Sequence, residues 1–386
     1  MLHKKHIIFA GNTAWSMYNF RRNLIQAFVA NDYTVTVLAP HDNVFTPKLL
    51  ELSVNFIPVA INPKGTNPIQ DIRLFLRYKK IFKRIKPDFI FFYTIKPNIY
   101  GSLAAQRCKI PHIAVTTGLG YTFLANNLTS KISKYLYKIA FQKVEQVWFL
   151  NDDDRQAFLH HKLVDKPKTF VLNGEGVDLE RFHISSLQKK TPVTFLLASR
   201  MLWDKGVGEF VEAARIIKRK YPDTKFQLLG FLGVGNPTAI CKKQMDKWQS
   251  EGIIDYLGVT DDVKPFIEAA TCVVLPSYYR EGIPFILLEG AASGRPVITT
   301  NWVGCKETVE DNITGFMCNV KDPVGLAACM EKAILLSPEQ YRDMALAGRK
   351  KMEQEFDVQL VIKHYLEILA KQQFPTKSEH YKKQQT

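Results

Sequence analysis

The residues best suited to chemistry fall in two short segments in the second half of the chain. The first segment runs from Arg200 to Gly206 and carries two cations, Arg200 and Lys205, between an apolar run and a stretch with helical spacing. Two cations beside the free N–H groups of a helix start can hold a diphosphate without a metal ion. Taken alone, the segment slightly favours the simpler interpretation, a pair of solvated charges on a surface loop.

The second segment, Pro276–Glu289, carries two carboxylates at a fixed spacing. A helix is expected to begin near Gly282–Pro284, because proline suits the first helical turn. Glu281 would then precede the helix, and Glu289 would lie about two turns inside it, rotated by about 80° around the axis. The two carboxylates can therefore serve different parts of one elongated ligand.

A simpler interpretation makes Glu281 a charge matched to the helix dipole and Glu289 a solvated residue. Against it, Glu289 lies in the apolar run FILLEGAASG. A glutamate in such a run is rarely buried without a partner. These residues alone leave both interpretations open.

Short apolar runs alternate along the chain with segments of helical spacing. This alternation predicts the strands and helices that position the two segments. Continuous rather than alternating apolar runs indicate strands that are covered on both faces, and their alternation with helices indicates parallel sheets. Ligands of such sheets bind beyond the carboxyl ends of the strands. The expected strands are His6–Gly11, Tyr33–Pro40, Phe56–Ile61, Asp88–Thr94, His112–Thr117 and Gln146–Asn151, then Val193–Arg200, Lys225–Gly230, Ile253–Gly258, Cys272–Pro276 and Pro296–Thr300.

The length of 386 residues predicts about two domains. The strand pattern restarts after the polar stretch His183–Pro192, so the domains are expected at 1–187 and 188–357. The last helical segment, about 358–374, has no strand after it and either caps the second domain or packs back on the first. Residues 375–386 are expected to form a polar, frayed tail.

The two segments form one ordered pattern, Arg200-x4-Lys205-Gly206 followed by Glu281-x7-Glu289. This pattern resembles that of the retaining glycosyltransferases of family 4, which adopt the GT-B fold. Further segments resemble the family in the family's own order: Asn173–Phe182, Gly258–Val263, Ala292–Ile298 and Asp311–Phe316. Within the family, LWDKGVGEFVEAA, YTIKPNIYG and TTGLGY are most similar to bacterial enzymes that extend polyprenyl-diphosphate-linked sugars, in N-glycan, O-antigen and capsule assembly.

The resemblance spans about the whole chain and implies two doubly wound, Rossmann-like α/β domains that face each other across a cleft. The N-terminal domain would bind the acceptor and the C-terminal domain the nucleotide-sugar donor. It further implies transfer of a sugar, an N-acetylhexosamine or hexose, from a UDP-sugar to a polyprenyl-diphosphate-linked glycan with retention of configuration. No metal, no other cofactor and no protein nucleophile are expected.

The resemblance implies a role for each residue of this chain that matches the family's motifs. Arg200 and Lys205 would neutralise the leaving diphosphate. Glu281 would accept hydrogen bonds from the donor sugar, beside the backbone N–H groups of Gly282 and Ile283. Fixed cations suit this chemistry, because negative charge develops on the departing phosphate.

Other residues would bind the nucleoside and the opposite side of the diphosphate. Glu289 would hold the ribose hydroxyls, and the backbone around Gly258 and Val259 would contact the nucleobase. The turn at Gly11 and Asn12 would face the diphosphate from the N-terminal domain.

One segment departs from the family pattern, and two others are assigned structural roles. Many relatives carry a histidine where this chain has residues 116–121, which contain none. The nearby His112 is expected to be an ordinary strand residue. Asn151–Asp154 contains an Asp-x-Asp, but its place between a strand and a helix favours helix capping over metal binding.

The composition excludes several classes of protein. With 46% hydrophobic residues the chain is not disordered, and it has no run of about 18 apolar residues that would span a membrane. Six cysteines without a Cys-x-x-Cys pair, and an apolar run too short for a signal peptide, predict a cytoplasmic location.

The formal charge of +15 predicts an anionic partner and lies almost wholly in one half. Residues 1–190 hold 27 Lys and Arg against 13 Asp and Glu, whereas residues 191–386 hold 25 against 24. The basic, aromatic segments Arg73–Lys86 and Lys131–Lys138 fit either ordinary packed helices or contact with an anionic membrane surface. The latter predicts peripheral association with the inner face of the bacterial plasma membrane.

Two other functions compete with the transferase. A basic nucleic-acid-binding protein would explain the charge, but the sequence shows no nucleic-acid-binding motif, and no nucleic-acid partner is expected. A UDP-sugar epimerase of GT-B fold would share the architecture, but it is not expected to carry the Arg/Lys pair and the paired glutamates in this order.

Overall fold

A computed structural model describes residues 4–62, 65, 67–119 and 128–371. The predicted polar tail, 375–386, lies outside these residues. The chain forms two compact units. The first comprises Met1–Thr117, Tyr121–Leu172 and Val358–Thr386, and the second comprises Gly118–Gly120 and Asn173–Asp357.

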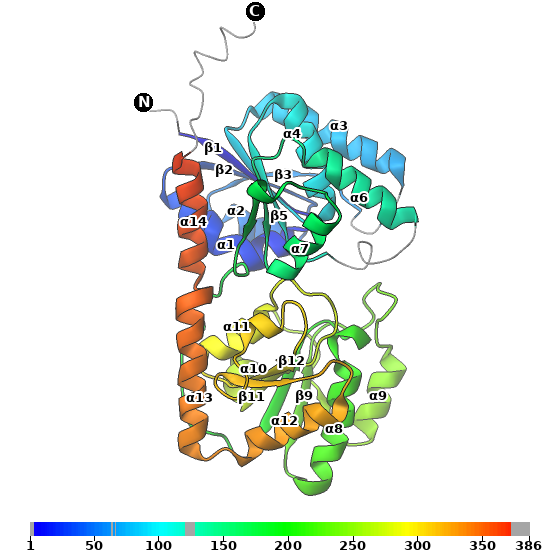
Figure 1. The fold of residues 1–386 in the computed structure, drawn as a ribbon, viewed down its shortest axis with the longest axis vertical. Helices are drawn as coiled ribbons and strands as arrows, with labels where there is room; N and C mark the ends of the chain where they lie inside the picture. The colour runs from blue at the N-terminus through cyan, green and yellow to red at the C-terminus, as the bar shows by residue number, and fades with distance from the viewer. Residues whose placement is uncertain (1–3, 63–64, 66, 120–127, 372–386) are drawn as a thin grey trace, which may run out of the picture. The chain divides into compact units, whose positions relative to one another are not determined.

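The first unit is built on a parallel sheet that has seven strands among the described residues, in the order β3-β2-β1-β4-β5-β6-β7 (Figure 1). Chain order reverses between β1 and β4, which pair with each other in register Ile8 to Ile90. The six predicted strands are confirmed, and β7 is an additional short strand at the sheet edge. The strands are β1 (His6–Ala10), β2 (Thr34–Ala39), β3 (Asn55–Pro58), β4 (Phe89–Tyr93), β5 (His112–Thr116), β6 (Gln146–Phe149) and β7 (Thr169–Val171).

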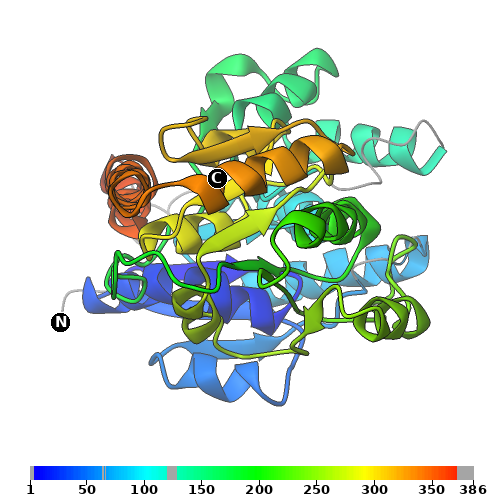
Figure 2. The ribbon, with the colours of Figure 1, turned by 90° about the horizontal axis from the view of Figure 1, so that it is seen from below.

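Helices cover both faces of this sheet (Figures 1 and 2). They are α1 (Ala14–Ala30), α2 (Phe45–Leu50), α3 (Pro68–Ile85), α4 (Ser102–Cys108), α6 (Leu128–Ala140), α7 (Asp152–His160) and α14 (Val358–Lys371). The middle strands β4 and β5 are wholly buried, as continuous apolar runs require.

The C-terminal helix α14 packs on the first sheet, which decides between the two placements that the sequence left open. Tyr365 supplies the contact. Its ring lies 4.8 Å from that of Phe91 and 4.6 Å from that of Trp148, and its hydroxyl lies 3.0 Å from the hydroxyl of Tyr93. A helix far along the chain thereby becomes part of the core of the first unit.

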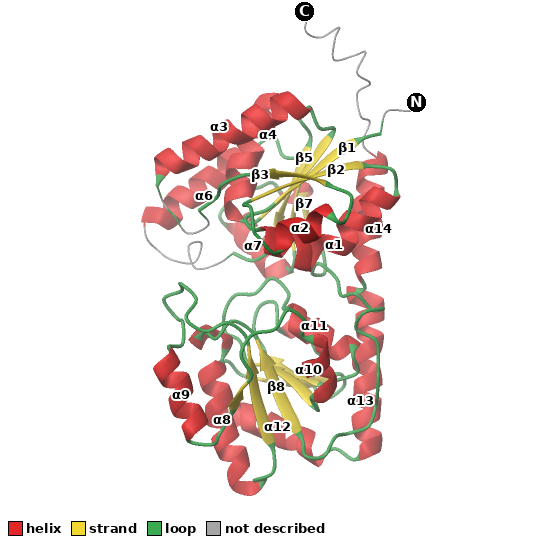
Figure 3. Cartoon of the chain, turned by 180° about the vertical axis from the view of Figure 1, so that it is seen from behind, coloured by secondary structure: helices red, strands yellow, loops and turns green. Residues whose placement is uncertain are grey.

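The second unit repeats the architecture with a parallel sheet of six strands among the described residues, in the order β10-β9-β8-β11-β12-β13. Figure 3 shows α8 and α9 on one side of it, and α10, α11 and α13 on the other. The strands are β8 (Thr194–Ala198), β9 (Lys225–Leu229), β10 (Asp255–Tyr256), β11 (Cys272–Leu275), β12 (Val297–Thr300) and β13 (Gly315–Cys318). The helices are α8 (Val207–Lys220), α9 (Lys242–Ser250), α10 (Lys264–Ala269), α11 (Phe285–Ala292), α12 (Pro323–Leu335) and α13 (Pro338–Lys351).

The predicted domain boundary after residue 187 is too late along the chain, because residues 173–187 belong to the second unit. Val177 N donates to Phe356 O at 2.7 Å. Arg349 Nη1 donates to Phe182 O at 2.8 Å. This stretch contains no strand of either sheet, so its sequence resembles a linker, although its backbone is bound to the second unit.

The order of strands in the second sheet explains where the candidate site must lie. Chain order reverses between the neighbouring strands β8 and β11. Ligands of doubly wound sheets bind beyond the carboxyl ends of the strands at such a reversal. The segments Arg200–Gly206 and Pro276–Glu281 are the loops that follow these two strands.

Candidate active site

The loop after β8 is a tight turn that presents Lys205 at the start of α8. Residues Trp203–Lys205 form one turn of 3-10 helix, and Gly206 ends it with a φ of 75°. A Cβ atom on Gly206 would lie 2.1 Å from the carbonyl oxygen of Pro276, on the neighbouring loop. Glycine at this position therefore lets the two loops approach closely.

Hydrogen bonds join this turn to the loop after β11. The backbone carbonyl of Asp204 accepts from the backbone N–H groups of Tyr278 and Tyr279, both at 2.9 Å. Ser277 Oγ lies 3.2 Å from the same oxygen. The two loops that carry the predicted cations and the first predicted carboxylate thus form one hydrogen-bonded unit.

Lys205 and Glu281 meet within this unit. Lys205 Nζ forms an ion pair with Glu281 Oε1, and the two side chains are only 10% and 11% exposed. Ser277 Oγ donates to the same carboxylate oxygen at 3.1 Å. A buried charge pair costs desolvation energy and needs further hydrogen bonds, which this hydroxyl supplies. The site thereby holds a cation and a carboxylate in fixed positions.

Tyr279 lies against both predicted cations. The Arg200 guanidinium is 6.0 Å from the centre of its ring, and Lys205 Nζ is 5.3 Å from it. Arg200 is exposed, in contrast to the buried Lys205. An exposed guanidinium beside a fixed ammonium group can contact an anionic ligand that enters from solvent.

Glu289 lies in α11 and is half-buried. Burial raises its pKa from 4.5 to about 7; nearby Arg181 opposes the rise, and Asp262 adds to it. Arg181 itself is paired with Asp262, with Nη2 2.7 Å from Oδ1. The arrangement leaves a carboxyl that titrates near neutral pH and suits a ligand with hydroxyl groups.

Backbone positions complete the donor-side residues predicted from the sequence. Gly258 has a φ of 77°, its carbonyl accepts from Gly230 N at 2.7 Å, and Val259 is 49% exposed. Gly282 and Ile283 are buried just ahead of α11. All the donor-side residues predicted from the sequence therefore lie in the second unit.

The remaining predicted residues belong to the first unit. Gly11 follows β1 at the point where strand order reverses, and a Cβ atom there would lie 2.5 Å from Met17 Sδ. Asn12 follows it, and Thr13 caps α1 by accepting from Ser16 N at 3.1 Å. Their contact with a diphosphate remains a prediction.

Two segments that the sequence assigned to structural roles have those roles. His112 is buried in β5, its Nδ1 lies 3.0 Å from Ile110 O, and burial lowers its pKa to about 4. Asn151 caps α7 by accepting from Asp154 N at 2.8 Å. Residues 120 and 121, at the end of the segment without a histidine, lie outside the described part of the chain.

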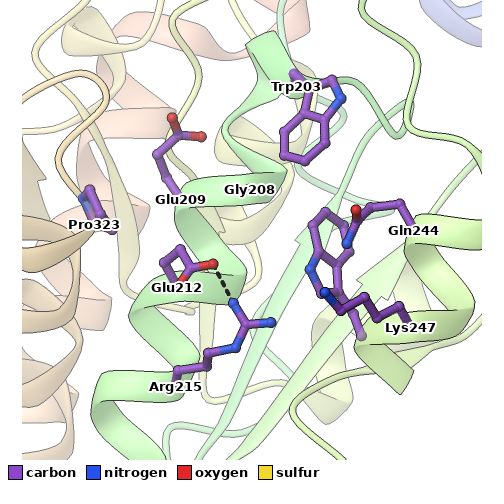
Figure 4. A pocket seen from close by; sticks show the side chains of 9 residues that line it. Trp203, Gly208, Glu209, Glu212, Arg215, Gln244, Lys247 and Pro323 are labelled. Atoms are coloured by element: carbon purple, nitrogen blue, oxygen red, sulfur yellow. Dashed lines mark hydrogen bonds and ion pairs between the residues drawn. The ribbon is translucent and has the colours of Figure 1, made fainter. Parts of the chain in front are cut away.

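A separate groove of about 410 Å³ runs between α8 and α9. The predicted donor-side residues do not line it, although Trp203, which does, belongs to the same turn as Lys205. Figure 4 shows Trp203 beside Gly208, and an ion pair between Glu212 and Arg215. The lining residues are Trp203, Gly208, Glu209, Glu212, Arg215, Gln244, Lys247, Trp248 and Pro323.

Three residues of the site were not predicted from the sequence. Ser277 and Tyr279 stand in the same loop as Glu281, but their contacts with the turn after β8 depend on the fold. Arg181 stands in the segment 173–182 that supported the resemblance, and that segment was the available signal.

Comparison with known proteins places this geometry in a family. A model described as "Glycosyl transferases group 1" matches residues 192–335, and one described as "Glycosyl transferase 4-like" matches residues 6–151. Together they cover both units. The chain belongs to the group 1, family 4-like glycosyltransferases. The transferase resemblance seen in the sequence is therefore confirmed, and the two alternative functions are not favoured.

Among curated relatives, a Campylobacter jejuni protein named N,N'-diacetylbacillosaminyl-diphospho-undecaprenol alpha-1,3-N-acetylgalactosaminyltransferase is 27% identical over 379 residues, 93% of this chain and 97% of that protein. An Escherichia coli protein named UDP-Gal:alpha-D-GlcNAc-diphosphoundecaprenol alpha-1,3-galactosyltransferase is 26% identical over 281 residues, 69% of this chain and 71% of that protein.

Solved structures show the same fold. A Rickettsia africae glycosyltransferase is 19% identical, with a TM-score of 0.78 over 95% of this chain and 98% of that one. Anabaena Alr3699/HepE, solved in complex with UDP and glucose, is 17% identical, with a TM-score of 0.79 over 96% of this chain and all of that one. The predicted GT-B fold of this glycosyltransferase is confirmed. None of its described helices is long and apolar enough to cross a membrane.

Proposed function

We propose that this glycosyltransferase moves a sugar from a UDP-sugar to a polyprenyl-diphosphate-linked glycan, with retention of configuration. The observation that carries the proposal is the buried pair of Lys205 and Glu281 at the point where strand order reverses. It supplies a cation for a leaving phosphate and a carboxylate for sugar hydroxyls at one place. The exposed Arg200 adds a second cation beside them.

The chemistry follows from the charge that the reaction develops. Breaking the bond between an anomeric carbon and a phosphate oxygen leaves negative charge on the diphosphate, and preorganised cations lower that barrier. Lys205 is already held in position by Glu281, so little side-chain entropy is lost when the diphosphate binds. Glu281 accepts hydrogen bonds from the donor sugar, and Glu289 accepts them from the ribose.

The names of the relatives support the proposed substrates. The Campylobacter jejuni and Escherichia coli relatives are named for undecaprenol-linked diphosphate acceptors, and the second is also named for a UDP-linked donor. Assembly of a bacterial surface polysaccharide or glycoprotein glycan is the process in which such a product is used.

The direct test is a screen of UDP-sugars against short polyprenyl-diphosphate-linked mono- and disaccharides, read by mass spectrometry. A product heavier by one hexose or N-acetylhexosamine residue is expected with one donor. Isomerisation of a UDP-sugar without any acceptor product would contradict the proposal and indicate an epimerase.

We further propose that the first unit rests on an anionic membrane surface, where a lipid-linked acceptor would lie. Helices α3 and α6 project from the same side of this unit in Figures 1, 2 and 3. On α3, Ile69, Ile72 and Leu76 lie along one face and are 60%, 59% and 53% exposed. Exposed basic residues of α3 flank this stripe: Arg73, Arg77, Lys80, Lys83 and Arg84.

Helix α6 repeats the pattern with Leu128, Ile132 and Tyr135, which are 72%, 51% and 65% exposed. Lys131 and Lys138 are exposed beside them. Exposed apolar residues flanked by lysine and arginine suit the boundary between headgroups and acyl chains. The excess of positive charge in residues 1–190 favours the same surface.

A further inference from the structure

We infer that Ser277 is a positioning residue for Glu281: its buried hydroxyl fixes the carboxylate in the orientation that receives the donor sugar. The inference rests on the proposed role of Glu281. Ser277 contacts the carboxylate, whereas no role with substrate is proposed for Ser277 itself.

The hydroxyl of Ser277 has defined partners on two sides. The side chain is wholly buried in the loop, two residues after β11. Its Oγ accepts from Tyr279 N at 3.2 Å, and its single hydrogen faces two acceptors, Glu281 Oε1 at 3.1 Å and Asp204 O at 3.2 Å. A hydrogen bond to a carboxylate is stronger than one to a neutral carbonyl, so the hydrogen points to Glu281.

The backbone of Ser277 is hydrogen-bonded to the neighbouring strand. Its backbone carbonyl accepts from the hydroxyl of Thr300, a buried residue of β12. The loop is therefore held by the neighbouring strand on one side and by the carbonyl of Asp204 on the other. A hydroxyl held in this way can orient a carboxylate rather than follow it.

The hydroxyl of Ser277 gives the Glu281 carboxylate a hydrogen bond that does not involve Lys205. Glu281 Oε1 receives both Lys205 Nζ and Ser277 Oγ. When a diphosphate forms an ion pair with the ammonium group of Lys205, the serine hydroxyl still donates its hydrogen bond to the carboxylate. That hydrogen bond does not involve the cation that the leaving phosphate needs.

The test compares Ser277→Ala with Ser293→Ala. Ser293 is also wholly buried in the second unit, but its Oγ has no hydrogen-bond partner among the described residues. A hydrogen bond to a charged group contributes about 1.5–3 kcal/mol, so Ser277→Ala should lower kcat/KM for the UDP-sugar by about 10-fold or more. The Kd for UDP, which lacks the sugar, should change less than about 2-fold. Ser293→Ala should match the wild type in both.

A double-mutant cycle distinguishes positioning from a general loss of structure. If Ser277 acts through Glu281, adding Ser277→Ala to Glu281→Gln should lower kcat/KM much less than it does in the wild type. Ser277→Thr, which keeps the hydroxyl, should retain more activity than Ser277→Ala. Equal effects of Ser277→Ala in both backgrounds, or wild-type kcat/KM in Ser277→Ala, would overturn the inference.

Failure of the proposed function would give a different result. If the wild type transfers no sugar, the same cycle is measured as the shift in melting temperature. If the two side chains contact each other, the melting temperature of the double variant should fall by less than the sum of the decreases in the two single variants. Additive shifts would overturn the positioning role whatever the substrate is.

Discussion

Replacing Glu289 with glutamine should stabilise the free protein much more at pH 8 than at pH 5. Burial raises the pKa of this carboxyl from 4.5 to about 7. The folded state therefore binds a proton more readily than the unfolded state between these values, and the wild type loses stability as the pH rises through that window.

The magnitude follows from the size of the shift. Each unit of pKa difference corresponds to about 1.4 kcal/mol, so a shift from 4.5 to about 7 costs the wild type about 3 kcal/mol of unfolding free energy at pH 8. Glutamine has nearly the same shape and carries no charge to desolvate. Glu289→Gln should therefore exceed the wild type by up to about 3 kcal/mol at pH 8.

Urea unfolding at pH 5 and pH 8 measures the effect, with Glu51→Gln as the control. Glu51 is exposed at the end of α2, so its substitution should give the same small difference at both pH values. Binding of UDP to the wild type should also release a proton near pH 6.5, because ribose hydroxyls favour the ionised carboxylate. Calorimetry in buffers of different ionisation enthalpy detects that proton. The reasoning is refuted if the stability difference between variant and wild type is the same at pH 5 and pH 8.

Two further substitutions test other parts of the structure. Gly206→Ala should lower the unfolding free energy by at least about 2 kcal/mol in urea titrations, because its φ of 75° is left-handed and its Cβ would overlap Pro276 O; an unchanged midpoint would contradict the close contact of the two loops. The double variant Ile72→Ser/Leu76→Ser should reduce co-sedimentation with phosphatidylglycerol vesicles at least several-fold, while Leu335→Ser, at a leucine of the second unit that is 65% exposed, should not. Equal binding to phosphatidylcholine vesicles, or no weakening by salt, would remove the membrane proposal.

Much of the fold could be predicted because most strands of the two parallel sheets are buried and therefore appear as short, continuous apolar runs between helical segments. The two strands that were missed have different causes. β7 has three half-buried residues at a sheet edge, so it lacks a continuous apolar run. β13 is four residues long and begins within the segment Asp311–Phe316, which was assigned to a family motif. The stretch 173–187 was misplaced because its attachment to the second unit uses hydrogen bonds that composition does not reveal.

The charged residues of the site could be predicted because their types and spacing are restrictive, whereas their neighbours could not. Ser277 meets Asp204, and Arg181 meets Asp262, across 73 and 81 positions of sequence. A serine in a loop has no distinctive local pattern, and the available signal for Arg181 was its place in the segment 173–182 that supported the resemblance. Only the adjacency of β8 and β11 reveals what Ser277 does.

The initial rate of sugar transfer by Lys205→Met, compared with Lys220→Met, tests most directly whether the buried pair carries the reaction. Lys220 is 66% exposed at its side chain and pairs with Glu331 away from the site. Loss of a group that stabilises developing charge costs about 100-fold or more. Lys205→Met is therefore expected to transfer sugar at least about 100-fold more slowly at saturating substrate, with Lys220→Met unchanged. Turnover by a folded Lys205→Met within a few-fold of the wild type would contradict the assignment of this site.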